Sequence, residues 1–149
     1  EQMQRVFKQS FMLSVTTAIA LLFAGCGESK VAQCNKVIKV ANQASSLGQE
    51  FGKNPNPAKG SKALTELAGK IDPLTQEMKT LEIKDEKLQG FQGRFITLYQ
   101  NISKQLNNAA GAIDKKNIPA AQGFLVSLKQ SSTEESSIVS EINSYCSGK

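Results

Sequence analysis

The clearest pattern in the chain is Leu64-Thr-Glu-Leu-Ala-Gly-Lys-Ile-Asp-Pro-Leu-Thr-Gln-Glu-Met-Lys-Thr-Leu81. Its apolar residues are separated alternately by three and four positions: Leu64, Leu67, Ile71, Leu74, Met78 and Leu81. This spacing places them on one stripe of a helix that packs against other helices. Pro73 lies inside the pattern, and because the stripe keeps its phase across this residue we expect a kink in one helix rather than a turn.

Three further segments carry a similar stripe. The first runs from about Val31 to Phe51 and is followed by a loop over residues 52–60, which is dense in Gly, Pro and Asn. Another helix is expected from Asp85, a suitable N-cap, to a turn over residues 114–119, and Pro119 suits the first turn of the last helix. Strand-like alternation is absent from the sequence, so the predicted fold is all-α, an up-down four-helix bundle over residues 31–149.

The last helix has a polar interruption in its stripe. Its apolar positions are Ala121, Phe124, Leu128, Ile138, Ile142 and Tyr145, with Ser131 and Glu135 at the two seam positions between them. The run Ser131-Ser-Thr-Glu-Glu-Ser-Ser137 either lines a cavity or binds a partner, or it is a locally weak stretch of helix. Glu135 is a functional carboxylate, a polar layer that fixes the helix register, or a side chain rotated outward.

Arg94 is a candidate partner for Glu135, because it is the one arginine left after residue 25. Counted outward from the predicted turn near residue 116, Arg94 is about level with residue 138 of the last helix. Glu135 is within one helical turn of that level, so we expect a structural ion pair between Arg94 and Glu135.

The N-terminal segment differs from the rest of the chain. Arg5 and Lys8 precede the apolar run Phe11–Ala24, which is shorter than the roughly 20 residues that a membrane-spanning helix needs. The run ends in Leu21-Leu22-Phe23-Ala24-Gly25-Cys26, which resembles a bacterial lipobox. The resemblance implies a signal peptide over residues 1–25, lipid attachment at Cys26 and a lipidated tether over 26–30; an uncleaved anchor and ordinary secretion are the alternatives.

Two cysteines remain if Cys26 carries lipid, namely Cys34 and Cys146. An even remainder in an exported chain predicts a disulfide, with two free buried thiols as the alternative. Four antiparallel helices bring both ends of the chain to one end of the bundle, where these cysteines would meet.

Composition excludes several functions. The chain of 149 residues has no histidine, so it lacks the commonest general base and metal ligand. We therefore expect no catalytic residues, no metal and no cofactor. Removing residues 1–25 takes away two of 18 basic and one of 13 acidic residues, which changes the net charge from +5 to +4. The remaining lysines are scattered, as on a solvated face or a face toward an anionic membrane, and nothing indicates nucleic-acid binding.

Three stretches of the mature chain resemble small helical lipoproteins of cyanobacteria with no assigned activity: Val31–Asn35, Asp85–Phe95 and Asn143–Cys146. The resemblance implies a membrane-anchored protein on the exported side, facing the periplasm or the thylakoid lumen. Our first interpretation is a non-enzymatic scaffold or binding subunit of a membrane protein complex. The alternative is a binding module for a small apolar or pigment-like ligand in the bundle core, which a cavity near residues 131–137 would favour.

Overall fold

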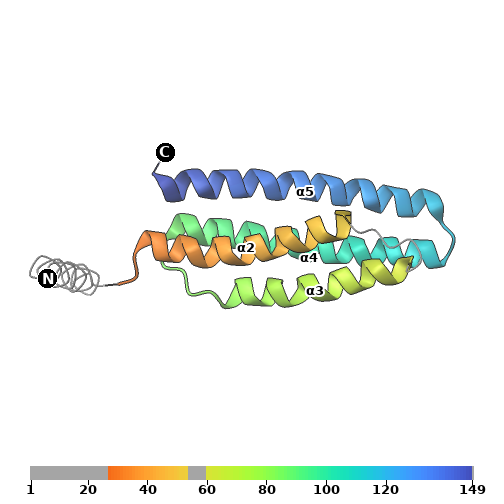
Figure 1. Ribbon diagram of the computed structural model, residues 1–149, viewed down its shortest axis with the longest axis horizontal. Coiled ribbons are helices and arrows are strands. Elements are labelled where there is room, and N and C mark those ends of the chain that lie inside the picture. Colours follow the sequence, from red (N-terminus) through yellow and green to blue (C-terminus); the bar gives the residue numbers. More distant parts are fainter. Residues whose placement is uncertain (1–26, 54–59, 149) are drawn as a thin grey trace, which may run out of the picture.

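Four helices make up most of residues 27–53 and 60–148, which are the residues that the computed structural model describes. They are α2 (Lys30–Lys53), α3 (Ser61–Thr80), α4 (Glu86–Asp114) and α5 (Ile118–Ser147). Consecutive helices run in opposite directions along one long axis (Figure 1). The described part of the chain contains no strand, and the predicted all-α four-helix bundle is confirmed.

Helix α3 continues through Pro73 without a break, as its unbroken apolar stripe predicts. Leu64, Ile71 and Met78 of this stripe are buried, and the residues between them pack against the core from its edge. The stripe is therefore wide enough to contact α2 on one side and α4 on the other.

The helix starts follow the expected capping chemistry. The Asp85 side chain accepts a hydrogen bond from the backbone N–H of Leu88 at 2.9 Å and caps α4. The Asn117 side chain accepts one from the N–H of Ala120 at 3.2 Å, and Pro119 lies in the first turn of α5. Both boundaries agree with the sequence-based prediction.

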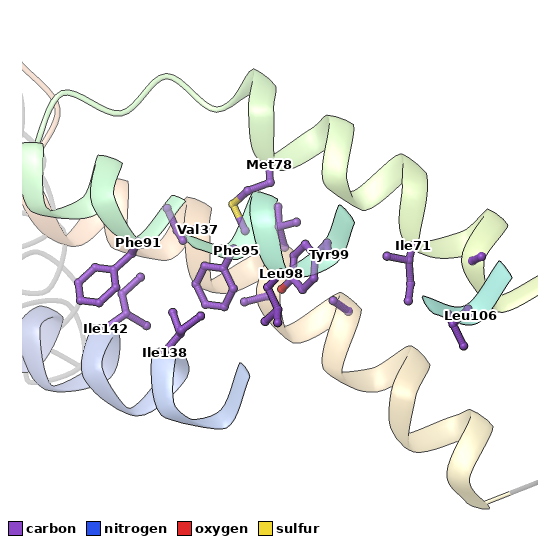
Figure 2. Close-up of a cluster of buried hydrophobic side chains, with 14 of the residues drawn as sticks. Val37, Ile71, Met78, Phe91, Phe95, Leu98, Tyr99, Leu106, Ile138 and Ile142 are labelled. Atoms are coloured by element: carbon purple, nitrogen blue, oxygen red, sulfur yellow. The ribbon is translucent and has the colours of Figure 1, made fainter. Parts of the chain in front are cut away.

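The core is densest where α4 lies between the other helices. Figure 2 shows Phe91 and Phe95 of α4 opposite Ile138 and Ile142 of α5, and Phe95 is completely buried. The ring of Tyr99 stacks on that of Phe95 with centroids 5.8 Å apart. Because the carbon framework of a tyrosine buries well but its hydroxyl needs a partner, Tyr99 is an unusual choice for this position.

The two ends of the described chain meet at one end of the bundle (Figure 1). The predicted disulfide is present there: Cys34 of α2 is bonded to Cys146 of α5, with their Cα atoms 6.1 Å apart. Next to it, the Tyr145 hydroxyl donates a hydrogen bond to Asp85 at 2.8 Å, and the Lys30 ammonium lies 3.8 Å from the centre of the Tyr145 ring. The bond and this cluster hold α2, α4 and α5 together.

Candidate functional site

A groove of about 1140 Å³ runs between α2 and α5, the first and last helices of the described bundle. Its apolar walls come from all four helices: Phe51 of α2, Leu67 and Ile71 of α3, Tyr99, Ile102 and Leu106 of α4, and Leu128 and Val139 of α5. Three residues of the predicted polar run, Ser132, Glu135 and Ser136, border it on the α5 side. The polar run therefore lines a cavity, which was one of the two interpretations left open above.

Small residues explain why this seam stays open. Where α2 faces the groove it carries Ala44, Ser45 and Gly48, and α5 carries Ser132 and Ser136. None of these side chains is long enough to fill the space between the two helices. Between α4 and α5, by contrast, the larger side chains of Phe91, Phe95, Ile138 and Ile142 belong to the buried core. The groove is thus a consequence of residue size along two helix faces.

A hydrogen bond between the side chains of Ser45 and Glu135 crosses the groove. The Ser45 hydroxyl donates a hydrogen bond to Oε1 of Glu135 at 2.8 Å. Ser45 lies as many residues after Cys34 as Glu135 lies before Cys146. The Ser45–Glu135 hydrogen bond and the disulfide therefore fit the same antiparallel register of α2 and α5. Burial raises the pKa of the Glu135 carboxyl, and the hydrogen bond from Ser45 opposes this shift.

Tyr99 is the second polar residue of the groove. Its side chain is completely buried, and its hydroxyl has no hydrogen-bond partner within residues 27–53 and 60–148. Burial, together with the nearby charge of Glu135, raises the pKa of the Tyr99 hydroxyl, so this group stays protonated. Figure 2 shows the hydroxyl oxygen on the side of the ring that faces away from α3.

The predicted ion pair of Arg94 with Glu135 does not form. Arg94 instead pairs with Glu141, with its Nη1 2.5 Å from Oε2 and its Nη2 3.4 Å from Oε1. Arg94 lies level with Glu141 rather than with residue 138, so α5 is displaced by three residues, about one helical turn, from the register counted from the predicted turn. Glu135 lies nearly two turns before Glu141 and faces α2, whereas Glu141 faces α4.

Both members of the observed pair are exposed, with 44% of the Arg94 side chain and 48% of the Glu141 side chain accessible. The hydrogen bond from Arg94 lowers the pKa of the Glu141 carboxyl. The pair is therefore a surface contact between α4 and α5 and lies outside the groove.

Two of the groove residues were missed by the sequence analysis, namely Ser45 and Tyr99. The sequence does indicate that Tyr99 is buried. It lies four positions after Phe95 and three before Ile102, and this spacing continues a second apolar stripe on α4. Nothing in the spacing of apolar residues distinguishes Ser45 from its neighbour Ser46. Which of the two serines contacts Glu135 depends on where α5 lies against α2.

A further apolar surface lies on the first half of α5 and adjoins the groove at Leu125. Ile118, Leu125 and Val126 are 54%, 44% and 59% exposed. The adjoining turn carries Lys115 and Lys116, and it lies at the end of the bundle opposite the disulfide (Figure 1). Apolar side chains that remain exposed together are often covered by a partner.

Cys26, the predicted lipidation site, lies outside the described residues. Within the described ranges, no helix is both long and apolar enough to cross a membrane, and no cluster of Asp, Glu and Cys is arranged to hold a metal ion.

Comparisons of the chain with protein-family models, curated proteins and solved structures gave no significant match.

Proposed function

We propose that the protein is a non-enzymatic binding module that holds a small apolar molecule in the groove between α2 and α5. The observation that carries the proposal is the buried Tyr99 hydroxyl, which lacks a partner in the described structure and lines a groove of about 1140 Å³. Ligand sites typically have volumes of roughly 300–1000 Å³, apolar walls and a few polar groups that orient the ligand. The groove has this composition and sufficient room.

The position of the groove supports ligand binding over scaffolding alone. A core packed throughout its length would favour a purely structural role, because close-packed helices leave no volume for a ligand. Here the open seam borders Ser132, Glu135 and Ser136, part of the polar run on α5. Filling it with an apolar molecule would remove the half-buried side chains of Leu128 and Val139 from water, at about 25 cal/mol per Å² of apolar surface.

The membrane attachment belongs to the same proposal. Lipid on Cys26 would tether the module to the exported face of a membrane, either periplasmic or thylakoid-lumenal. Only a few residues separate Cys26 from Cys34, so the disulfide end of the bundle would face the bilayer. A module tethered in this way would meet apolar ligands at the membrane surface, where such compounds concentrate.

The test is binding of a neutral apolar dye, N-phenylnaphthylamine, whose fluorescence rises in apolar surroundings. The full chain carries Cys26→Ser so that no attached lipid competes. Gly48→Leu places a side chain in the groove, and Gly90→Leu is its matched control; both glycines are exposed helix positions with open space around a new Cβ. We expect Gly48→Leu to weaken dye binding about tenfold or more, with no change for Gly90→Leu. Equal affinities in all three proteins would contradict the proposal.

A second candidate function, docking to a membrane protein complex, is favoured by the exposed Ile118, Leu125 and Val126. Here the protein would act as a scaffold subunit, with the disulfide end toward the membrane and this surface toward its partner. Crosslinking in native membranes with a tag at Lys149 tests it, and Val126→Lys is compared with Val31→Lys, which changes an exposed valine (58% accessible) at the other end. Loss of the same crosslinked product only with Val126→Lys supports docking, and identical patterns oppose it.

A further inference from the structure

The groove contains two polar groups whose hydrogen-bonding capacity is unused in the described structure. The Tyr99 hydroxyl is one donor and one acceptor, and it bonds to nothing within the described ranges. A buried hydroxyl without a partner has lost its hydrogen bonds to water, so a group that bonds to it gains more than it would at an exposed site.

Glu135 supplies a complementary group. The Ser45 hydroxyl occupies Oε1, and no hydrogen bond to Oε2 is found among the described residues. As a carboxylate, Glu135 accepts hydrogen bonds and donates none. In the antiparallel register that Arg94 and Glu141 set, Glu135 of α5 lies level with residue 100 of α4, next to Tyr99, and both residues line the groove. A molecule that reaches the buried Tyr99 hydroxyl there meets one donor and one acceptor.

We infer that the groove selects a neutral amphipathic alcohol, whose hydroxyl oxygen accepts a hydrogen bond from Tyr99 and whose hydroxyl proton is donated to Glu135. This inference rests on the proposed function and names its ligand class. The apolar body of the alcohol lies along Ile71, Ile102 and Leu106, which form the apolar floor of the groove beside Tyr99. A hydroxyl is the smallest head group of an organic ligand that completes both hydrogen bonds.

Other head groups fit the same place less well. A carboxylate is repelled by Glu135 and cannot donate to it, and Lys129 at the groove edge belongs to the exposed surface. An ammonium pairs with Glu135 but offers no acceptor to the Tyr99 proton. A hydrocarbon leaves both polar groups without partners and covers them with apolar surface, which is the least favourable arrangement.

The test compares decanol, decanoate, decylammonium and decyl methyl ether as competitors of N-phenylnaphthylamine on the Cys26→Ser chain at neutral pH. We expect decanol to compete best. The ether keeps the bond from Tyr99 but cannot donate to Glu135, so its affinity should fall between those of decanol and a hydrocarbon. Because all four compounds carry an unbranched alkyl chain of nine or ten carbons, large differences in affinity report on the head group.

Two variants assign the selectivity to its residues. Tyr99→Phe should weaken decanol about three- to tenfold and leave the dye, which has no hydroxyl, unchanged. Glu135→Gln removes the negative charge, so decanoate should gain affinity relative to decanol. Thermal unfolding of each variant checks that the bundle is intact.

The outcomes separate this inference from the proposed function. Suppose that the dye binds and Gly48→Leu blocks it, but decanol is not preferred or Tyr99→Phe leaves its affinity unchanged. The inference that the ligand is an alcohol is then wrong, whereas the proposal of a binding module is retained. If neither the dye nor any of the four compounds binds, both proposals fail.

Discussion

The buried carboxyl group of Glu135 links the stability of this bundle to pH. Burial raises its pKa in the folded protein above the ordinary value of 4.5, whereas in the unfolded chain it has the ordinary value. Between these two pKa values the folded state binds more protons than the unfolded state. The contribution of Glu135 to stability therefore decreases as the pH rises through this window, and the full penalty is present above it.

Glu135→Gln should accordingly stabilise the protein at neutral pH, and the gain should shrink as the pH falls toward 4.5. Urea unfolding midpoints of both proteins across this range measure the difference. The pKa values of Asp85 and Glu141 are lowered, so these groups contribute to the pH dependence of stability with the opposite sign. Their contribution is the same in the wild type and in Glu135→Gln and cancels in the comparison. A variant that is less stable than the wild type at neutral pH would show that the carboxylate is favourably solvated.

The contact of Arg94 gives a second prediction. A double-mutant cycle with Arg94→Met and Glu141→Gln should yield a coupling free energy of about 0.2–1 kcal/mol, because the pair is exposed. The matched cycle with Arg94→Met and Glu135→Gln should be additive within about 0.3–0.5 kcal/mol, since the two residues face different helices. Coupling in the second cycle but not the first would contradict the observed register.

For single residues, the sequence predicts which side chains lie on the apolar stripe of a helix. It does not determine which side chain of a neighbouring helix each of them contacts. Cys34 and Cys146 could be paired from their number and from the topology, because a bundle has only two ends. Arg94 was assigned the wrong partner because an error of one helical turn in register changes which side chain it meets. The Tyr99 site depends on which seam remains open, and that follows from the packing of all four helices.

At the scale of elements, the connection between α3 and α4 is held by glutamine side chains. Oε1 of the buried Gln33 accepts hydrogen bonds from the backbone N–H groups of Lys84 at 2.7 Å and Asp85 at 3.0 Å. Nε2 of Gln92 donates to the carbonyl groups of Met78 at 2.8 Å and Leu81 at 3.0 Å, near the end of α3. Polar groups at the helix ends thus find partners on neighbouring helices.

Gln33→Leu should lower the free energy of unfolding by about 1–3 kcal/mol, because it leaves two N–H groups of the connection without their acceptor. Gln43→Leu is the control, since Gln43 is an exposed position of the same helix, and we expect a change within about 0.5 kcal/mol. Chemical denaturation measures both. Equal effects would mean that the connection is held by its apolar contacts alone.

The helices themselves were the most predictable part of the molecule. Their stripes of Leu, Ile and Phe follow helical spacing, and Asp85, Asn117 and Pro119 mark two of the starts. The glutamine contacts could not be predicted, because Gln33 has the same local sequence signal as any polar residue beside a stripe.

At the scale of the whole molecule, the Cys34–Cys146 bond restricts the unfolded chain more than it shapes the folded one. The cysteines are 112 positions apart, so the bond closes a loop that includes nearly all of the bundle. A loop of this size lowers the conformational entropy of the unfolded state by an amount worth roughly 4–5 kcal/mol in the chain-entropy description.

Reduction should therefore lower the free energy of unfolding by up to about 4–5 kcal/mol while leaving the helix content at room temperature largely unchanged. Denaturation with and without dithiothreitol, followed by circular dichroism, measures this difference. The protein with both cysteines replaced by serine serves as the control, because reductant should not affect it. An unchanged midpoint on reduction of the native protein would show that the bond contributes little.

The same bond also determines what a proteolytic cut would do. Lys115 and Lys116 are exposed in the turn between α4 and α5, where trypsin cleaves after lysine. A cut there separates α5 from α4 along the backbone, yet α5 remains covalently attached to α2 through Cys146. The two fragments of the nicked protein would stay joined through the disulfide until it is reduced, and reduction would then release the fragment that carries α5.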